Sequence, residues 1–134
     1  MKSQIEFIFS AGSINDQFMN ITINGNSIEV RELFTASIEV ELPTTIEIQV
    51  SGKSPLDTVV KNNVIVADKY IKLDSIYIDG FKVESWQIPE KYLILTTVNN
   101  EMLSTAYWGR NGKVQFIIDQ DDPALWLLEC PKVI

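Results

Sequence analysis

The chain has 134 residues, a formal net charge of −7 and no histidine. This length suits one domain with a single core, so we expect residues 1–134 to form one domain. The negative charge argues against a nucleic-acid partner, and the missing histidine excludes Ser-His-Asp and Cys-His catalysis and zinc–imidazole sites.

Apolar and polar residues alternate along most of the chain, which is the period-2 pattern of half-buried strands. The first 13 residues already alternate, so we interpret them as a strand of the mature protein rather than a signal peptide. No apolar run approaches the roughly 20 residues of a membrane span, so we expect no membrane partner. Strands are predicted around residues 5–9, 19–23, 38–40, 46–50, 64–66, 71–78, 81–83, 93–95, 114–118 and 125–128.

Turn sequences separate these strands. Asn24-Gly25, Asp79-Gly80 and Asn111-Gly112 are each the dipeptide that a type I′ hairpin prefers. Residues 51–63 form the longest predicted loop, which is long enough to be functional. Many antiparallel strands with short turns predict an all-β fold. We favour a jelly-roll-like antiparallel sandwich of two sheets with nine or ten short strands; a single closed barrel is the alternative.

One predicted strand changes the face of its apolar residues. Ile71 and Leu73 are at odd positions, whereas Ile76 and Ile78 are at even ones. An extra residue near Asp74-Ser75 would form a β-bulge there, and a strand bending between two sheets would have the same effect.

Carboxylates near the long loop are candidate metal ligands. Asp57 and Asp68 offer hard oxygen atoms of the kind that Ca²⁺ requires, so we keep both as candidate calcium ligands. The spacing does not match an EF-hand, and such residues also suit turns and caps. No other cofactor is expected.

Exposed aromatic residues are candidate binding residues. Trp86, Tyr107 and Trp108 are the residues we expect to act as surface anchors for a ligand or a partner, although core packing is the alternative for aromatics in general. Cys130 is the only cysteine, so no internal disulfide forms, and we expect a buried thiol.

Residues 68–80 read DKYIKLDSIYIDG. This segment resembles a strand of calcium-dependent, xylan-binding-type carbohydrate-binding modules, which has the form D-x-x-V-x-V-D-x-I-x-V-D-G. SQIEFIFSAGSINDQFMNITINGNSIE and PTTIEIQVSGK are also similar to that family, so the resemblance covers roughly residues 3–83. It implies a sandwich that binds calcium and a polysaccharide. The family's first ligand position falls on Ser51-Gly52-Lys53, and Asp68 matches the second.

The rest of the chain suggests another relationship. SGKSPLDTVVKNNVIVADKYIKLD followed by YWGRNG is similar to small virion proteins of tailed phages. That resemblance implies a non-enzymatic virion component, such as a capsid decoration, tail or fibre protein. Its partners would be other virion or protein subunits in an oligomer, and host-surface glycan.

Three functions follow from these patterns. We prefer the non-enzymatic virion component; the alternative is a secreted, calcium-dependent carbohydrate-binding module that recognises a polysaccharide. A glycan-active enzyme ranks last, because the sequence offers no nucleophile and base that pair by pattern.

Overall fold

A computed structural model describes residues 1–14, 17–54 and 58–130 of the chain. Strands dominate the described residues, as the alternation predicts. The strands are β1 (Lys2–Gly12), β2 (Asn20–Ile23), β3 (Asn26–Glu29), β4 (Leu33–Glu41), β5 (Thr44–Ser51), β6 (Thr58–Lys61), β7 (Val64–Asp68), β8 (Tyr70–Ile78), β9 (Phe81–Glu84), β10 (Leu93–Thr97), β11 (Met102–Leu103), β12 (Tyr107–Trp108) and β13 (Gly112–Ile118). Short helices are η2 (Ser85–Gln87), η3 (Glu90–Tyr92) and α1 (Pro123–Leu127).

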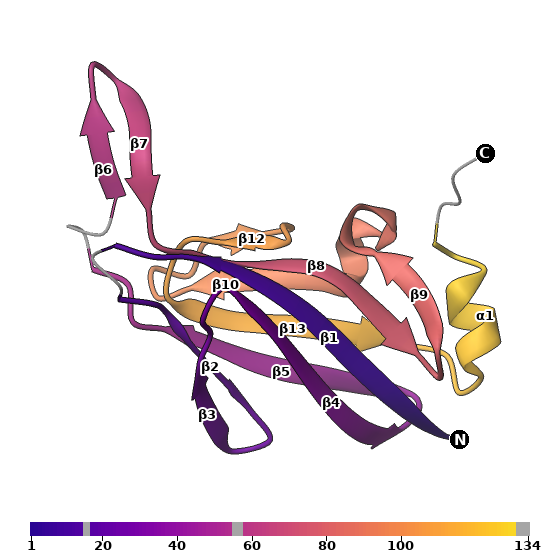
Figure 1. Cartoon of the computed structure of the whole chain (residues 1–134). Helices are drawn as coiled ribbons and strands as arrows, with labels where there is room; N and C mark the ends of the chain where they lie inside the picture. The colour runs from indigo at the N-terminus through magenta and orange to yellow at the C-terminus, as the bar shows by residue number, and fades with distance from the viewer. Residues whose placement is uncertain (15–16, 55–57, 131–134) are drawn as a thin grey trace.

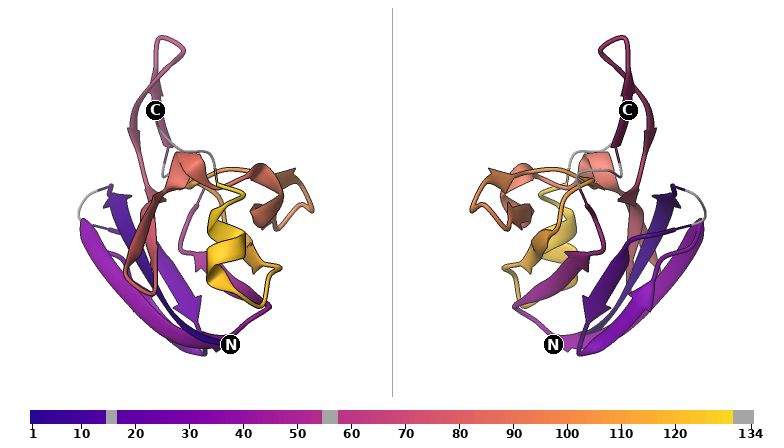
Figure 2. Two further views of the ribbon diagram at one scale, coloured as in Figure 1. Left: turned by 90° about the vertical axis from the view of Figure 1, so that its right-hand side faces the viewer. Right: turned by 90° about the vertical axis from the view of Figure 1, so that its left-hand side faces the viewer.

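Two large antiparallel sheets pack face to face (Figures 1 and 2). The first has the order β12-β8-β1-β4, with β9 also pairing with β8. The second has the order β11-β10-β13-β5-β2-β3. The predicted fold class, an all-β sandwich of two antiparallel sheets, is confirmed. The alternative of one closed barrel is wrong, because the strands form two separate sheets.

The core lies between the sheets. Phe7 and Phe9 of β1 are fully buried and face the second sheet, where Phe116 of β13 packs edge-on against Phe7 at a ring distance of 5.6 Å. Trp126 of α1 packs against the same Phe116 ring, also at 5.6 Å. Each such buried aromatic contributes about 2 to 3 kcal/mol of hydrophobic stabilisation.

The predicted β-bulge in β8 is present. Ile8 of β1 pairs with Ser75 and Phe9 pairs with Leu73, so Asp74 is the extra residue between them. The Ser10 hydroxyl donates a hydrogen bond to the Asp74 carboxylate at 3.1 Å. Because the bulge adds one residue, the apolar residues on either side of it all point into the core; these are Ile71, Leu73, Ile76 and Ile78.

Two of the three predicted type I′ turns form as expected. Asn24-Gly25 joins β2 to β3 and Asp79-Gly80 joins β8 to β9, and all four residues have positive φ. The Asn111-Gly112 prediction is wrong. That dipeptide leads from β12 in the first sheet to β13 in the second, because its flanking residues pair with different strands.

The prediction of one long loop over residues 51–63 is wrong in its last part. β6 and β7 pair as a separate two-stranded hairpin, which projects from the sandwich at the upper left of Figure 1. Its turn is Asn62-Asn63, with φ of 52° and 63°. Asparagine tolerates this left-handed conformation, so the pair substitutes for the usual Asn-Gly.

The predicted strand at residues 125–128 is also wrong, because α1 occupies most of it. Asp122 caps the helix by accepting a 2.9 Å hydrogen bond from the Ala124 N–H, and Pro123 suits the first helical turn. Cys130 follows the helix and is buried, as expected. Within the described residues no helix is long and apolar enough to cross a membrane.

Candidate ligand-binding site

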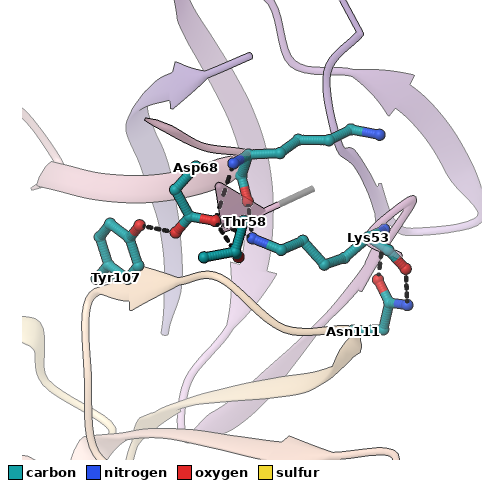
Figure 3. Close-up of polar contacts among 6 residues, drawn as sticks. Lys53, Thr58, Asp68, Tyr107 and Asn111 are labelled. Atoms are coloured by element: carbon teal, nitrogen blue, oxygen red, sulfur yellow. Dashed lines mark hydrogen bonds and ion pairs between the residues drawn. The ribbon is translucent and has the colours of Figure 1, made fainter. Parts of the chain in front are cut away.

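Asp68 ends β7 and is the centre of a polar cluster at the base of the β6–β7 hairpin (Figure 3). One carboxylate oxygen, Oδ1, accepts hydrogen bonds from the Lys53 ammonium, from the Thr58 hydroxyl at 2.7 Å and from the Lys69 N–H at 3.0 Å. The other, Oδ2, accepts one from the Tyr107 hydroxyl. Three donors from separate parts of the chain, together with the N–H of the next residue, therefore meet on one carboxylate.

Lys53 follows β5, and both its backbone and its ammonium group are held by hydrogen bonds. Its backbone N–H donates to Asn111 Oδ1 at 2.9 Å, and Asn111 Nδ2 donates to its carbonyl at 2.8 Å. Its ammonium forms an ion pair with Asp68 and also donates to the Lys69 carbonyl. The side chains of the pair are only 11% and 14% exposed. The ammonium is therefore a fixed and largely buried charge.

This cluster sets the protonation states of its members. Burial by itself raises the pKa of Asp68, but the hydrogen bonds from Lys53, Tyr107 and Thr58 outweigh burial and hold that pKa below its ordinary value. Burial, followed by the hydrogen bond and negative charge of Asp68, raises the pKa of Tyr107. At neutral pH Asp68 is thus a charged acceptor and Tyr107 a neutral donor.

The lowered pKa of Asp68 predicts how stability depends on pH. Because the pKa is lower in the folded state than its ordinary value of 3.8, ionised Asp68 stabilises the fold above that value. This stabilisation is lost as the pH falls through the folded-state pKa. In urea denaturation, the stability difference between the wild type and Asp68→Asn should be constant from about pH 7 to 5 and shrink below about pH 4. A constant difference down to about pH 2 would contradict this explanation.

A cleft of about 520 Å³ adjoins the cluster, between the base of the β6–β7 hairpin and the segment from β10 to β12. Asp68 and Tyr107 line it, and Tyr107 remains 42% exposed. Tyr70 stacks on the Tyr107 ring with centroids 4.7 Å apart. Arg110 also lines the cleft and pairs with Glu101 at 2.7 Å. The cleft thus presents a fixed aromatic ring beside an acceptor and a guanidinium group.

The other candidate residues lie elsewhere. Trp108 is wrong as a surface anchor, because its side chain is fully buried and packs near Phe9 at a ring distance of 5.7 Å. Adjacent residues of a strand point to opposite faces, so Tyr107 and Trp108 of β12 do not both reach the surface. Trp86 in η2 is 63% exposed but does not line this cleft. Asp57 lies outside the described residues.

The described residues at this cluster do not fit a calcium ion. Ca²⁺ takes six to eight oxygen ligands, and the described residues contain no group of three or more His, Cys, Asp or Glu side chains that could hold a metal. The Lys53 ammonium contacts the carboxylate of Asp68, which the sequence resemblance matches to a ligand position, and it also contacts the Lys69 carbonyl. A metal ion at these oxygens would be repelled by the positive charge of the Lys53 ammonium.

No protein-family model matches this sequence, and no curated protein matches it either. Among solved structures the chain is similar to vCBM60, described as part of an evolutionary link, by circular permutation, between two families of calcium-dependent carbohydrate-binding modules. The TM-score is 0.49 and the identity 16%, over 86% of this chain and 90% of the other. A structure of vCBM60 in complex with galactobiose gives a TM-score of 0.46 and 15% identity, over 85% and 97% of the two chains.

These structural neighbours are of the same class, calcium-dependent carbohydrate-binding modules, as the resemblance found in the sequence. The expected similarity to small virion proteins of tailed phages is not shown by these comparisons. Location in a virion, or secretion, stays a prediction.

The sequence did not identify most of the residues that surround Asp68. Asn111 belongs to a turn dipeptide and Tyr70 to a strand pattern, but neither pattern, nor any at Thr58, indicates a contact with Asp68. Lys53 stands at a metal-ligand position of the resemblance, which does not predict an ion pair. The contacts of Lys53 span 15 residues to Asp68 and 58 residues to Asn111. One usable signal was the alternation of β12, which assigns Tyr107 and Trp108 to opposite faces.

Proposed function

We propose that this protein is a non-enzymatic carbohydrate-binding module that holds a glycan in the cleft beside Tyr107 and Asp68. The observation that carries the proposal is the Tyr107 ring. It is held by the Tyr70 stack and by its hydrogen bond to Asp68, yet 42% of the residue stays exposed in the cleft. A rigid aromatic surface offers the apolar face of a sugar ring a packing partner without a large entropic cost.

Polar groups around the ring suit the hydroxyls of a sugar. Asp68 Oδ2 accepts a hydrogen bond from Tyr107, and a carboxylate oxygen has more than one lone pair. Arg110 has five N–H donors, and Nη1 donates one of them to Glu101. Ser104 and Thr105 also line the cleft. Hydrogen-bond donors and acceptors, including one positive and one negative side chain, therefore line the same cleft of about 520 Å³.

The single carboxylate among the described residues that line the cleft argues against glycoside hydrolysis. That reaction needs two carboxyl groups across the scissile bond, one of them a proton donor with a raised pKa. Among the described residues that line the cleft, Asp68 is the only carboxylate, and its pKa is lowered. These groups suit binding without turnover.

Titration calorimetry against xylohexaose, cellohexaose and galactobiose tests this proposal. At least one of these probes should bind the wild type, and Tyr107→Ala should weaken that binding by about tenfold or more, because the aromatic surface is lost. Trp86→Ala is the matched control, since Trp86 is an exposed aromatic away from the cleft, and it should leave the affinity unchanged. Absence of binding to all three glycans, or an equal loss in Trp86→Ala, would overturn the proposal.

A further inference from the structure

Lys53 occupies an unusual position for a lysine. Its ammonium lies between the Asp68 carboxylate and the Lys69 carbonyl, and its side chain is 11% exposed (Figure 3). Lysine ammonium groups ordinarily stay in water, and burying one costs several kcal/mol unless its charge is paired and its N–H groups are bonded. In this protein the ammonium is paired with the negative charge of Asp68 and hydrogen-bonded to the Lys69 carbonyl.

The cluster around this ammonium joins three parts of the fold. Lys53 follows β5 of the second sheet, Asp68 ends β7, and the Lys69 carbonyl precedes β8 of the first sheet. Thr58 at the start of β6 donates to the same Asp68 oxygen as Lys53 does. One positive charge, placed among oxygen atoms, thus links both sheets to the base of the β6–β7 hairpin.

We infer that the Lys53 ammonium takes the place of a bound metal ion at this junction, so that the junction is organised without calcium. The inference does not depend on the proposed glycan binding, because it concerns how the fold is held together. Its support is that the oxygens available to a cation already bond an internal cation, and that Asn111 fixes the backbone from which this cation extends.

The first measurement compares the melting temperature of the wild-type protein in EDTA and in millimolar calcium. A ligand that binds only the folded state raises its stability by an amount that grows with the logarithm of one plus the ratio of ligand concentration to dissociation constant. The inference expects the two melting temperatures to agree within about 1 °C. A rise in calcium of more than about 3 °C would overturn it.

The second measurement converts the junction into a metal site. A glutamate at position 53 ends short of the place that the lysine nitrogen occupies, which leaves room for an ion about 2.4 Å from its oxygens. Lys53→Glu should melt below the wild type in EDTA, because two carboxylates face each other, and should gain about 5 °C in millimolar calcium. Lys113→Glu is the matched control: Lys113 pairs with Glu47 at 2.6 Å, but both side chains are about half exposed. Calcium should leave its melting temperature nearly unchanged.

Each outcome decides the inference. A folded Lys53→Glu that calcium stabilises no more than it stabilises Lys113→Glu would contradict the inference. The oxygens of Asp68 and Lys69 would then be unable to bind a metal ion in place of the ammonium. If Lys53→Glu does not fold, Lys53→Gln offers an oxygen without a second negative charge and should show a calcium-dependent gain of the same sign. A Lys53→Gln protein that is as stable as the wild type and insensitive to calcium would also overturn the inference.

Discussion

Replacing Asp68 with alanine is expected to lower the free energy of unfolding by about 3 kcal/mol. The change removes the negative partner of the Lys53 ammonium and leaves it bonded to the Lys69 carbonyl, although the Lys53 side chain is only 11% exposed. It also removes the acceptor of the Thr58 and Tyr107 hydroxyls. Most of the loss comes from the uncompensated buried charge rather than from the ion pair itself.

Urea denaturation of a mutant cycle measures this effect. Adding Lys53→Met to Asp68→Ala removes the stranded charge, so the double variant should recover a substantial part of the lost stability. Glu47→Ala is the matched control, because Glu47 is 48% exposed and its pair with Lys113 lies at the surface; it should cost less than about 1 kcal/mol. If Asp68→Ala costs as little as Glu47→Ala, the Lys53–Asp68 pair behaves as an ordinary surface contact.

Single-residue deletions in β8 are expected to differ sharply in their effects. Without Asp74, the bulge disappears and the remaining sequence alternates regularly, with Ile71, Leu73, Ile76 and Ile78 at every second position. This deletion should fold, and should lose about 1 kcal/mol with the Ser10–Asp74 hydrogen bond. Deleting the exposed Lys72 instead makes Ile71 and Leu73 adjacent, so one of them must leave the core.

The cost of the second deletion is large because both residues are fully buried. Turning one of them outward removes its hydrophobic stabilisation and leaves a cavity, which together cost about 3 to 5 kcal/mol. Chemical denaturation and near-ultraviolet circular dichroism compare the two proteins. A deletion of Lys72 that is no more harmful than the deletion of Asp74 would show that the bulge does not control the register of β8.

Local patterns in the sequence were sufficient to predict those features of the fold that depend only on neighbouring residues. The parity change around Asp74 predicted the bulge because burial imposes alternation on each half of β8 separately. Asn24-Gly25 and Asp79-Gly80 predicted hairpins because those residues adopt positive φ at little cost. The dipeptide rule gives the wrong result at Asn111-Gly112, because strand pairing far along the chain decides the direction there. It also misses the turn at Asn62-Asn63, which lies in the segment predicted as a loop.

The candidate site residues were predicted less well, because their contacts also depend on residues far apart in the sequence. Asp68 and Tyr107 lie together at one cleft, but residue type alone also selected Trp108, which is buried. The sequence by itself determined the alternating strands, the bulge, two of the turns and the presence of a carboxylate at position 68. Only the tertiary structure decided that this carboxylate meets the Lys53 ammonium and the Tyr107 hydroxyl. Those partners lie 15 and 39 residues away along the chain, so no local pattern records their meeting, and only the packing of β5, β7 and β12 brings the charges together.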